Sequence, residues 1–489
     1  MKFHSVLASS LALALALCTS CSTRSSPADD SPQVASGATR VGIPWWRQLH
    51  DSSLNQDVSA AFSSNPGLRA VALRIDQADA AVASARASTL PRLNLGFGYS
   101  EGRRREVDFG PYDLVPWQSG GQLSWEIDIS GKLRAAKKSA LESRAAAVWD
   151  FHSARLLLTS RIAATRMNLY RFNSELTDLE SALSASQGTI NALTERSQAG
   201  LIPDAVLEKQ RAGNDRLIRE KLDLKRLRDL IVLQLRTLRG GTNPTGITQA
   251  SFPSPASLPN RPLNELLASH PSILAAEARV RSAFQLAQSA RLDLLPSFQI
   301  NALAAGNRRG LTDRFRIWQV NAGPSLDIPI YDPLRLAALK TRKSQSKIAA
   351  AEYQKTVLDT LEEIESARIN FASHRAQLTA AHRETKALER TRNDAREQFE
   401  AGLTSQIEFL DTERRWLNAK RSQAALRQAM LNSHINLIKA TGGGRLTSLK
   451  IGTARFRKSE SLPDSAPSRR TGDTLMTRAN AVLPENFVA

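Results

Sequence analysis

Four short segments of the chain alternate strictly between apolar and polar residues, two within 92–129 and two within 297–330. In chain order, the apolar positions are Leu93, Leu95, Phe97 and Tyr99, then Leu123, Trp125, Ile127 and Ile129, then Phe298 and Ile300, then Trp318, Val320, Leu326 and Ile328. A period of two is that of a β-strand, whose side chains point alternately to opposite faces. The pattern therefore predicts a β-hairpin in each region, joined by a polar loop at 101–112 and at 307–314. The apolar face meets either lipid, as in a transmembrane strand, or a soluble core.

The segments that follow these hairpins have a helical period instead. Apolar residues recur at alternating spacings of three and four, interrupted only by an occasional polar residue, at Leu169, Phe172, Leu176, Leu179, Leu183, Ile190 and Leu193 and again at Leu217, Leu224, Leu227, Ile231 and Leu238. This spacing is the heptad of a coiled coil. Proline, which breaks helices, is absent from 117–202 and from 334–462. We therefore predict long helical hairpins over 131–240 and 333–441.

The chain contains the same unit twice. Residues 66–91 align with 271–296 without a gap and share the run Ser-Ala-Arg and a terminal Leu-Pro, and the segment SWEIDISGKLR at 124–134 matches SLDIPIYDPLR at 325–335. A repeat of this length exceeds the unit of a solenoid, so it indicates two similar halves. We assign repeat 1 to 45–240 and repeat 2 to 266–444, with an equatorial linker at 241–265.

Helix lengths suggest how the two repeats fit together. The helices predicted at 131–199 and 333–401 are each about 100 Å long at 1.5 Å per residue, roughly twice the length of their return helices. We expect each return helix to be completed by the opening helix of the other repeat, 271–295 or 66–90, with joints at the glycines of 240–241 and 442–444. The result would be a helical tube below the strands.

Four strands per chain are too few to close a barrel. Open strand edges in lipid would leave backbone groups unpaired, at a cost of several kcal/mol each. Three copies would bring together twelve strands, which is enough for a barrel with an aqueous pore. The predicted fold is therefore mainly α with a small transmembrane β part, built from two structural repeats and assembled as a homotrimer.

The ends of the chain have the composition of targeting and linker segments. Residues 1–20 read as a signal peptide that precedes Cys21, which we expect to carry a lipid. The alternatives are ordinary cleavage nearby or a Cys18–Cys21 redox or metal pair. Residues 21–44 then form a tether, and 445–489 a basic tail that is partly disordered. The net charge of +19 is spread over helices among acids, so we read it as solvated helix faces rather than as a nucleic-acid surface.

Motifs for catalysis are missing from the sequence. It has no phosphate-binding loop, no nucleophile elbow and no metal-ligand spacing among its seven histidines. We therefore predict no enzyme activity, no cofactor and no metal site. Energy for any transport would come from a partner.

The order and doubling of these features resemble the TolC-like outer-membrane factor family of outer membrane efflux proteins, in particular its lipidated branch. The resemblance covers roughly residues 40 to 445 and rests on the Ser-Ala-Arg and Leu-Pro signatures and on the Ala-Gly-Leu turns at 199–201 and 401–403. It implies a trimer with a twelve-stranded outer-membrane barrel and a periplasmic α-barrel. The implied function is a passive exit duct for drugs, metals or other toxic small molecules, lying in the outer membrane and extending into the periplasm. The implied partners are a periplasmic adaptor and an inner-membrane transporter of the RND type.

The resemblance also implies functional residues. The positions that match the family's adaptor-docking helix tips are Ala199, Gly200, Leu201 and Ile202 in repeat 1 and Ala401, Gly402, Leu403 and Thr404 in repeat 2. Glu408 and Asp411 match acids that close the periplasmic end. Phe399 and Thr404 stand where some members have a tyrosine and an arginine that lock this gate, so the lock differs or is absent here.

Two alternatives remain at this point. The same fold could serve as the outer duct of type I protein secretion, since the transporter selects the cargo. The chain could also be a non-conducting, lipid-anchored coiled-coil protein, but this class does not explain the alternating strands or the doubling.

Overall fold

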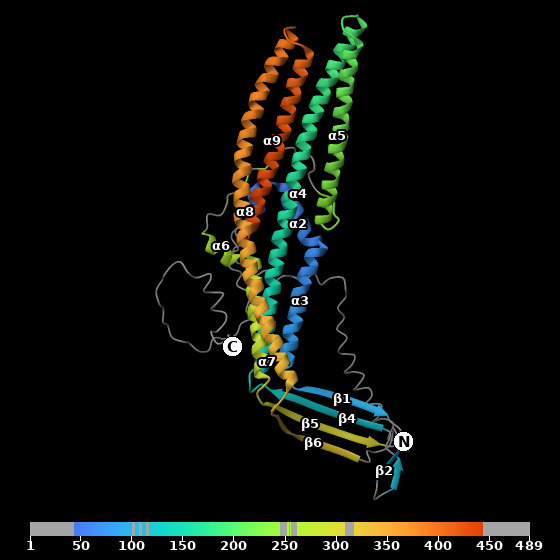
Figure 1. Cartoon of the computed structure of the whole chain (residues 1–489). Coiled ribbons are helices and arrows are strands. Elements are labelled where there is room, and N and C mark those ends of the chain that lie inside the picture. The colour runs from blue at the N-terminus through green and yellow to red at the C-terminus, as the bar shows by residue number, and fades with distance from the viewer. Residues whose placement is uncertain are drawn as a thin grey trace. The chain divides into compact units, whose positions relative to one another are not determined.

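The structure is a computed structural model in which long helices lead into a small antiparallel sheet (Figure 1). The described residues are 44–99, 103–106, 110–113, 117–244, 252–253, 255, 262–308 and 317–443. Cys21, the predicted signal peptide, nearly all of the tether and the tail lie outside them, as does much of the linker 241–265. Within these residues no helix combines the length and the apolar character needed to cross a bilayer.

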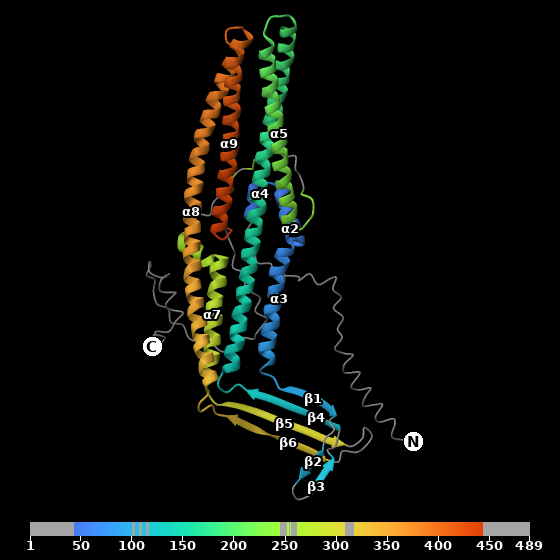
Figure 2. The same ribbon diagram turned by 45° about the vertical axis from the view of Figure 1, so that its right-hand side comes forward.

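Four long helices make up most of the described chain. They are α4 (Lys132–Gln198), α5 (Asp204–Leu238), α8 (Pro333–Glu400) and α9 (Gln406–Ala440). The 67 residues of α4 and the 68 of α8 each extend about 100 Å. As the heptad spacing predicts, α5 packs along the tip-side part of α4, and α9 packs along the tip-side part of α8 (Figure 2).

The seam between α4 and α5 consists of the predicted apolar residues. Leu176 and Leu179 of α4 pack with Leu224 of α5, and nearer the turn Ile190 and Leu193 pack with Leu207. These side chains meet because residues three and four apart lie on one face of a helix. The long hairpins are thus held together by their own apolar stripes.

Two shorter helices, α3 (Pro66–Ala87) and α7 (Pro271–Leu292), begin at the matching prolines of the two repeats. Proline is favourable at the first helical position, because its missing N–H would have no partner there. Helix α3 packs on α4, and α7 packs between α4 and α8. Both helices lead into strands of the sheet.

The predicted exchange of helices between the repeats is wrong. The C-terminal end of α5 meets the start of α3 in the same repeat, where Asn65 Nδ2 donates a hydrogen bond of 2.8 Å to the Leu238 carbonyl. The end of α9 likewise meets the start of α7, with Gly442 beside His270 and Pro271. The physical reason is that α7 and α9 both pack against α4 and α8, whereas α3 and α5 both pack against α4 on its other side. Each short helix therefore continues the line of its own return helix.

The sheet is antiparallel and has the order β1-β4-β5-β6. Its strands are β1 (Arg92–Tyr99), β4 (Trp117–Ile127), β5 (Ser297–Arg308) and β6 (Ile317–Asp327). The pairing of β4 with β5 joins the two repeats into one sheet. This arrangement leaves β1 and β6 at its two edges.

The register gives the sheet one apolar and one polar face. One transverse row consists of Leu93, Leu123, Ala302 and Ala322, and the neighbouring row consists of Arg92, Ser124, Asn301 and Gly323. On the apolar face the exposed fractions of Leu95, Phe97 and Trp318 are 72%, 79% and 73%. The described part of this chain therefore provides no core to cover that face, as a soluble hairpin would require.

The prediction of a plain polar loop at 101–112 is also wrong. Strands β2 (Arg103–Glu106) and β3 (Gly110–Asp113) lie there and pair antiparallel, with Arg103 opposite Asp113. The hairpin thus extends further than its apolar alternation. A polar two-stranded ladder has no apolar period to reveal it in the sequence.

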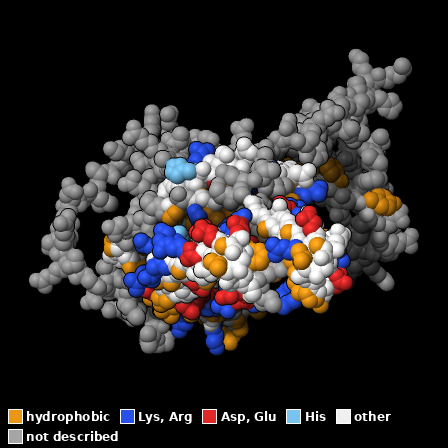
Figure 3. Space-filling view, turned by 90° about the horizontal axis from the view of Figure 1, so that it is seen from above, with side chains coloured by type: hydrophobic (Ala, Val, Ile, Leu, Met, Phe, Trp, Pro, Cys, Tyr) orange, Lys and Arg blue, Asp and Glu red, His pale blue; other side chains and the backbone are white. Residues whose placement is uncertain are grey.

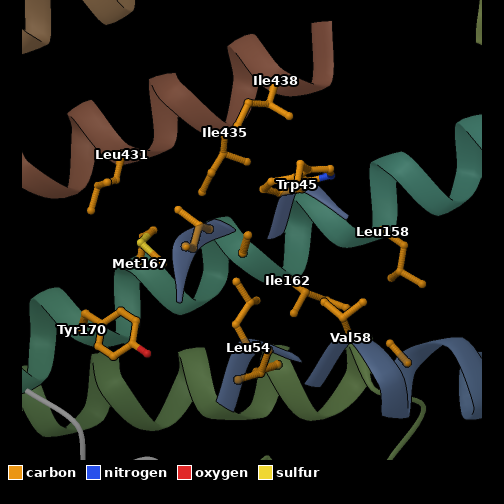
Figure 4. Close-up of a cluster of buried hydrophobic side chains, with 14 of the residues drawn as sticks. Trp45, Leu54, Val58, Leu158, Ile162, Met167, Tyr170, Leu431, Ile435 and Ile438 are labelled. Atoms are coloured by element: carbon orange, nitrogen blue, oxygen red, sulfur yellow. The ribbon is translucent and has the colours of Figure 1, made fainter. Parts of the chain in front are cut away.

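The largest apolar cluster lies where the N-terminal segment crosses the long helices. It joins the 3-10 helix η1 (Trp45–Leu49) and α2 (Ser52–Ser64) to the middle of α4 and the last turns of α5 and α9. Its members include Trp45, Leu54, Val58, Leu158, Ile162, Met167, Tyr170, Leu235, Leu431, Ile435 and Ile438 (Figure 4). The short helix α6 (Leu263–Ser269) contributes Leu267 to a second cluster with α7, α8 and α9.

One histidine of α4 makes stability depend on pH. Burial, and then the nearby Arg155, lower the pKa of His152 from 6.5 to about 4. The unfolded chain therefore binds the proton first, so stability falls as the pH drops from about 6.5 to about 4. We expect the melting temperature to fall across this window, and His152→Gln to flatten the curve. An equally steep curve in the variant would assign the pH dependence to other groups.

Candidate functional site

Both helical hairpins end in the same backbone geometry. Gly200 and Gly402 have φ angles of 70° and 74°. These angles are unfavourable for residues other than glycine, because a Cβ atom would clash with the backbone. The amide of Leu201 bonds the Arg196 carbonyl at 2.9 Å, and the amide of Leu403 makes the equivalent bond at 2.8 Å. These are the bonds that close a helix at a left-handed glycine. They leave the two leucines 73% and 80% exposed.

The residues around the two leucines differ between the tips. In the first hairpin Ile202 packs inward against the α4–α5 seam, while Ala199 is exposed. In the second hairpin Ala401 is exposed, and the half-buried Phe399 stacks on Phe409 with ring centroids 5.4 Å apart. Phe399 thus braces α8 against α9.

The two acids predicted at the gate lie in the first turns of α9 and have different partners. Glu408 is exposed and accepts a hydrogen bond of 2.7 Å from the Thr404 hydroxyl. Both oxygens of Asp411 are bound by arginines of its own helix, Oδ1 to Arg414 at 2.6 Å and Oδ2 to Arg415 at 2.8 Å. These two arginines are not among the predicted site residues, although their spacing of three and four from Asp411 indicates the pairs.

A buried ionic network connects the N-terminal segment to the long helices. It comprises Asp51, Asp57, Arg166, Tyr170 and Arg239, all of them buried. Arg166 Nε lies 3.2 Å from Asp51 Oδ2 and 3.1 Å from the Tyr170 hydroxyl, which itself donates to Asp51. Asp57 accepts from Arg166 through Oδ2 and from Arg239 through Oδ1, the latter at 2.8 Å. One carboxylate thereby joins α2 to both α4 and the end of α5.

The state of Tyr170 fits this network. Burial, and then its hydrogen bond to Asp51, raise the pKa of Tyr170 to about 12. The phenol therefore keeps its proton at neutral pH and remains a donor to the carboxylate. The sequence shows no motif for this cluster, because its members come from distant parts of the chain.

The described residues contain no group of three His, Cys, Asp or Glu side chains placed to hold a metal ion.

The fold and these features define a class of protein in which coiled-coil hairpins with exposed tips continue into a sheet with one lipid-compatible face. The family model described as outer membrane efflux protein matches residues 58–241 and 263–443. The chain therefore belongs to the outer membrane efflux protein family. Membership confirms the predicted family, the outer-membrane location and the prediction of an outer-membrane channel component of efflux systems.

Similar proteins include named efflux components. The chain is 26% identical over 430 residues to the pyoverdine export outer membrane protein OpmQ of Pseudomonas putida, covering 85% of this chain and 91% of that one. It is 23% identical over 411 residues to the probable outer membrane lipoprotein SilC of Salmonella typhimurium, covering 82% and 88%.

Solved structures share the fold. The crystal structure of CusC superposes with a TM-score of 0.74 at 21% identity, covering 83% of this chain and 96% of that one. The outer-membrane channel OprN superposes with a TM-score of 0.73 at 22% identity, covering 83% and 93%. These likenesses confirm the predicted fold class.

Proposed function

We propose that three copies of this chain form a passive exit duct through the outer membrane for toxic small molecules. The observation that carries the proposal is a four-stranded sheet whose apolar face is exposed and whose edge strands are β1 and β6. Lipid offers no partners for the backbone groups of an open edge. Pairing β6 of one copy with β1 of the next supplies them, and three copies close a twelve-stranded barrel.

The order of the helices supports the same ring. Packing runs from α8 through α9 and α4 to α5 on the side of the tips, and from α8 through α7 and α4 to α3 near the sheet. Helix α8 therefore borders one side of the chain, and α3 and α5 border the other. The bordering helices carry exposed apolar residues, Ile348, Leu358 and Ile369 on α8 and Ile218, Leu222, Leu230 and Leu233 on α5. Such a head-to-tail contact forms a closed ring when the rotation between copies permits.

In this assembly the polar face of the sheet lines the pore and the apolar face meets lipid. The chain acts without catalysis or a cofactor, because a duct only has to let its cargo pass. An inner-membrane transporter of the RND type supplies the energy through a periplasmic adaptor. Cys21 adds a lipid anchor after removal of residues 1–20, which agrees with the name of SilC as a probable lipoprotein.

The oligomeric state tests the proposal directly. Light scattering of the detergent-extracted protein, with the detergent mass subtracted, should give three times the chain mass. A stable monomer would show that the strands are not shared between chains, and the duct would then be wrong.

The exposed leucines of the tips are the proposed contacts with the adaptor, and Ala199 and Ala401 keep the turns narrow beside them. The double variant Leu201→Asp/Leu403→Asp places charges where apolar contact is needed, and it should reduce efflux-dependent tolerance to that of cells lacking the protein. Tolerance is measured as the growth-limiting concentration of an exported compound, with the trimer mass as a check on folding.

The matched control is Leu201→Met/Leu403→Met, which keeps the apolar surface and should keep tolerance. Unchanged tolerance in the aspartate variant, at normal trimer content, would exclude the tips as the docking surface.

The periplasmic gate in this proposal lies at the first turns of α9. Glu408 and Asp411 face the opening there, and Phe399 stacked on Phe409 holds the adjacent end of α8. Threefold symmetry brings three copies of each acid around the pore.

A further inference from the structure

The charges at the start of α9 are balanced within each chain. The two arginines that hold Asp411 have exposed side-chain fractions of 66% and 69%, whereas that of Asp411 is 33%. The guanidinium groups therefore face solvent more than the carboxylate between them. Thr404, the hydrogen-bond donor to Glu408, is neutral, so Arg414 and Arg415 are the two cations that match Glu408 and Asp411. The third acid of this segment, Glu413, pairs with Arg392 of α8 at 3.6 Å.

The balance matters for ions because the opposite charges are close together. Arg414 and Arg415 are one turn from Asp411, about 5 Å along the helix axis. That is less than the Debye length of about 8 Å at physiological salt, so an approaching ion experiences the carboxylates and guanidiniums together. Viewed toward the tips, acidic and basic side chains are intermingled on the surface rather than separated by sign (Figure 3).

We propose that Arg414 and Arg415 cancel the acid ring of the gate, so that the periplasmic mouth does not select cations and admits anionic cargo. This inference rests on the proposed duct, and it makes the two arginines its selectivity-determining residues. The cargo class that follows is organic anions, such as carboxylates or phosphates, which guanidinium groups bind with charge-assisted hydrogen bonds. A mouth with the two acids and no arginines would retain cations instead.

The test is the reversal potential of the purified full-length protein in a planar bilayer under a potassium chloride gradient. We expect the natural chain to show no preference for potassium. The variant Arg414→Gln/Arg415→Gln should raise the potassium-to-chloride permeability ratio about fivefold, because six acids then remain unbalanced around the pore. Asp411→Asn should lower the potassium-to-chloride permeability ratio. This variant provides a second test if Arg414→Gln/Arg415→Gln fails to assemble.

Two controls separate the local effect from a general loss of charge. Arg226 and Arg228 of α5 each pair with an aspartate in the natural chain. Arg226→Gln/Arg228→Gln removes the same number of acid-paired arginines and should leave the permeability ratio unchanged. Arg414→Lys/Arg415→Lys keeps the charge and should also leave it unchanged. A potassium preference in the natural chain that neither Arg414→Gln/Arg415→Gln nor Asp411→Asn alters would overturn the inference. Absence of any channel in the natural chain would contradict the duct itself.

Discussion

Replacing Asp57 with alanine should destabilise the protein by about 3–5 kcal/mol, the usual cost of removing one partner from a buried ion pair. The carboxylate of Asp57 has no exposed surface and binds both Arg166 and Arg239. Its loss leaves two buried guanidinium groups short of a counter-charge, at the point where α2 joins α4 and α5. We expect a large fall in the melting temperature of the detergent-purified protein. Unfolding is monitored by tryptophan fluorescence.

The matched control is Asp79→Ala, which removes an acid of α3 that pairs with Arg144 of α4. This pair is partly exposed, with side-chain fractions of 48% and 34%, so its loss should cost at most about 1 kcal/mol. Equal melting temperatures for the two variants would show that the buried network contributes no more than a surface pair. The inference that the buried ionic network anchors the N-terminal segment to the long helices would then be wrong.

The second large effect is expected at the joint between α5 and α3. Gly240 has a φ angle of 77°, and a Cβ atom there would lie 2.2 Å from the Ser64 carbonyl oxygen. The clash is with a backbone atom, which cannot move away by a change of rotamer as a flexible side chain can. Gly240→Ala therefore has to separate the two helix ends and to break the Asn65 bond to Leu238. We expect a loss of several kcal/mol, comparable to other severe backbone and packing defects.

The neighbouring glycine provides the control. Gly241 has a φ angle of 96°, but a Cβ atom on it would meet no atom within 4 Å. Gly241→Ala should therefore cost only the strain of a left-handed residue, about 1–2 kcal/mol. The difference in melting temperature between the two alanine variants measures the joint itself. If both lost the same amount, the close approach at Ser64 would carry no cost beyond the backbone angle.

The sequence predicted the local parts of the fold well because their signals are local. Strict alternation at Leu93, Leu95 and Phe97 is a property of one strand, and the register then collects such residues on one face. The heptad at Leu176 and Leu179 likewise depends on helix geometry alone. Glycine followed by leucine placed both helix tips, because a left-handed residue is needed to end each helix.

Two features of the site were not predicted. The pairs of Asp411 with Arg414 and Arg415 have the spacing of neighbours on one helix face, so the sequence does contain their signal. The network around Arg166 gave no signal, since Asp51 and Arg239 come from opposite ends of the first repeat. These charged residues become important for stability only because the fold buries them, so that each charge requires its partner.

By itself, the sequence determined the long helices and the four strands of the main sheet, their duplication and the family to which the chain belongs. These follow from periodicity, proline and glycine positions and repeated motifs, which are all encoded along the chain. Only the tertiary structure showed that α3 stacks end to end on α5, and that α7 stacks end to end on α9. The reason is that α7 and α9 pack against both α4 and α8, whereas α3 and α5 pack against α4 on its other side. Helix lengths could not distinguish the two arrangements, because they match almost equally well in both.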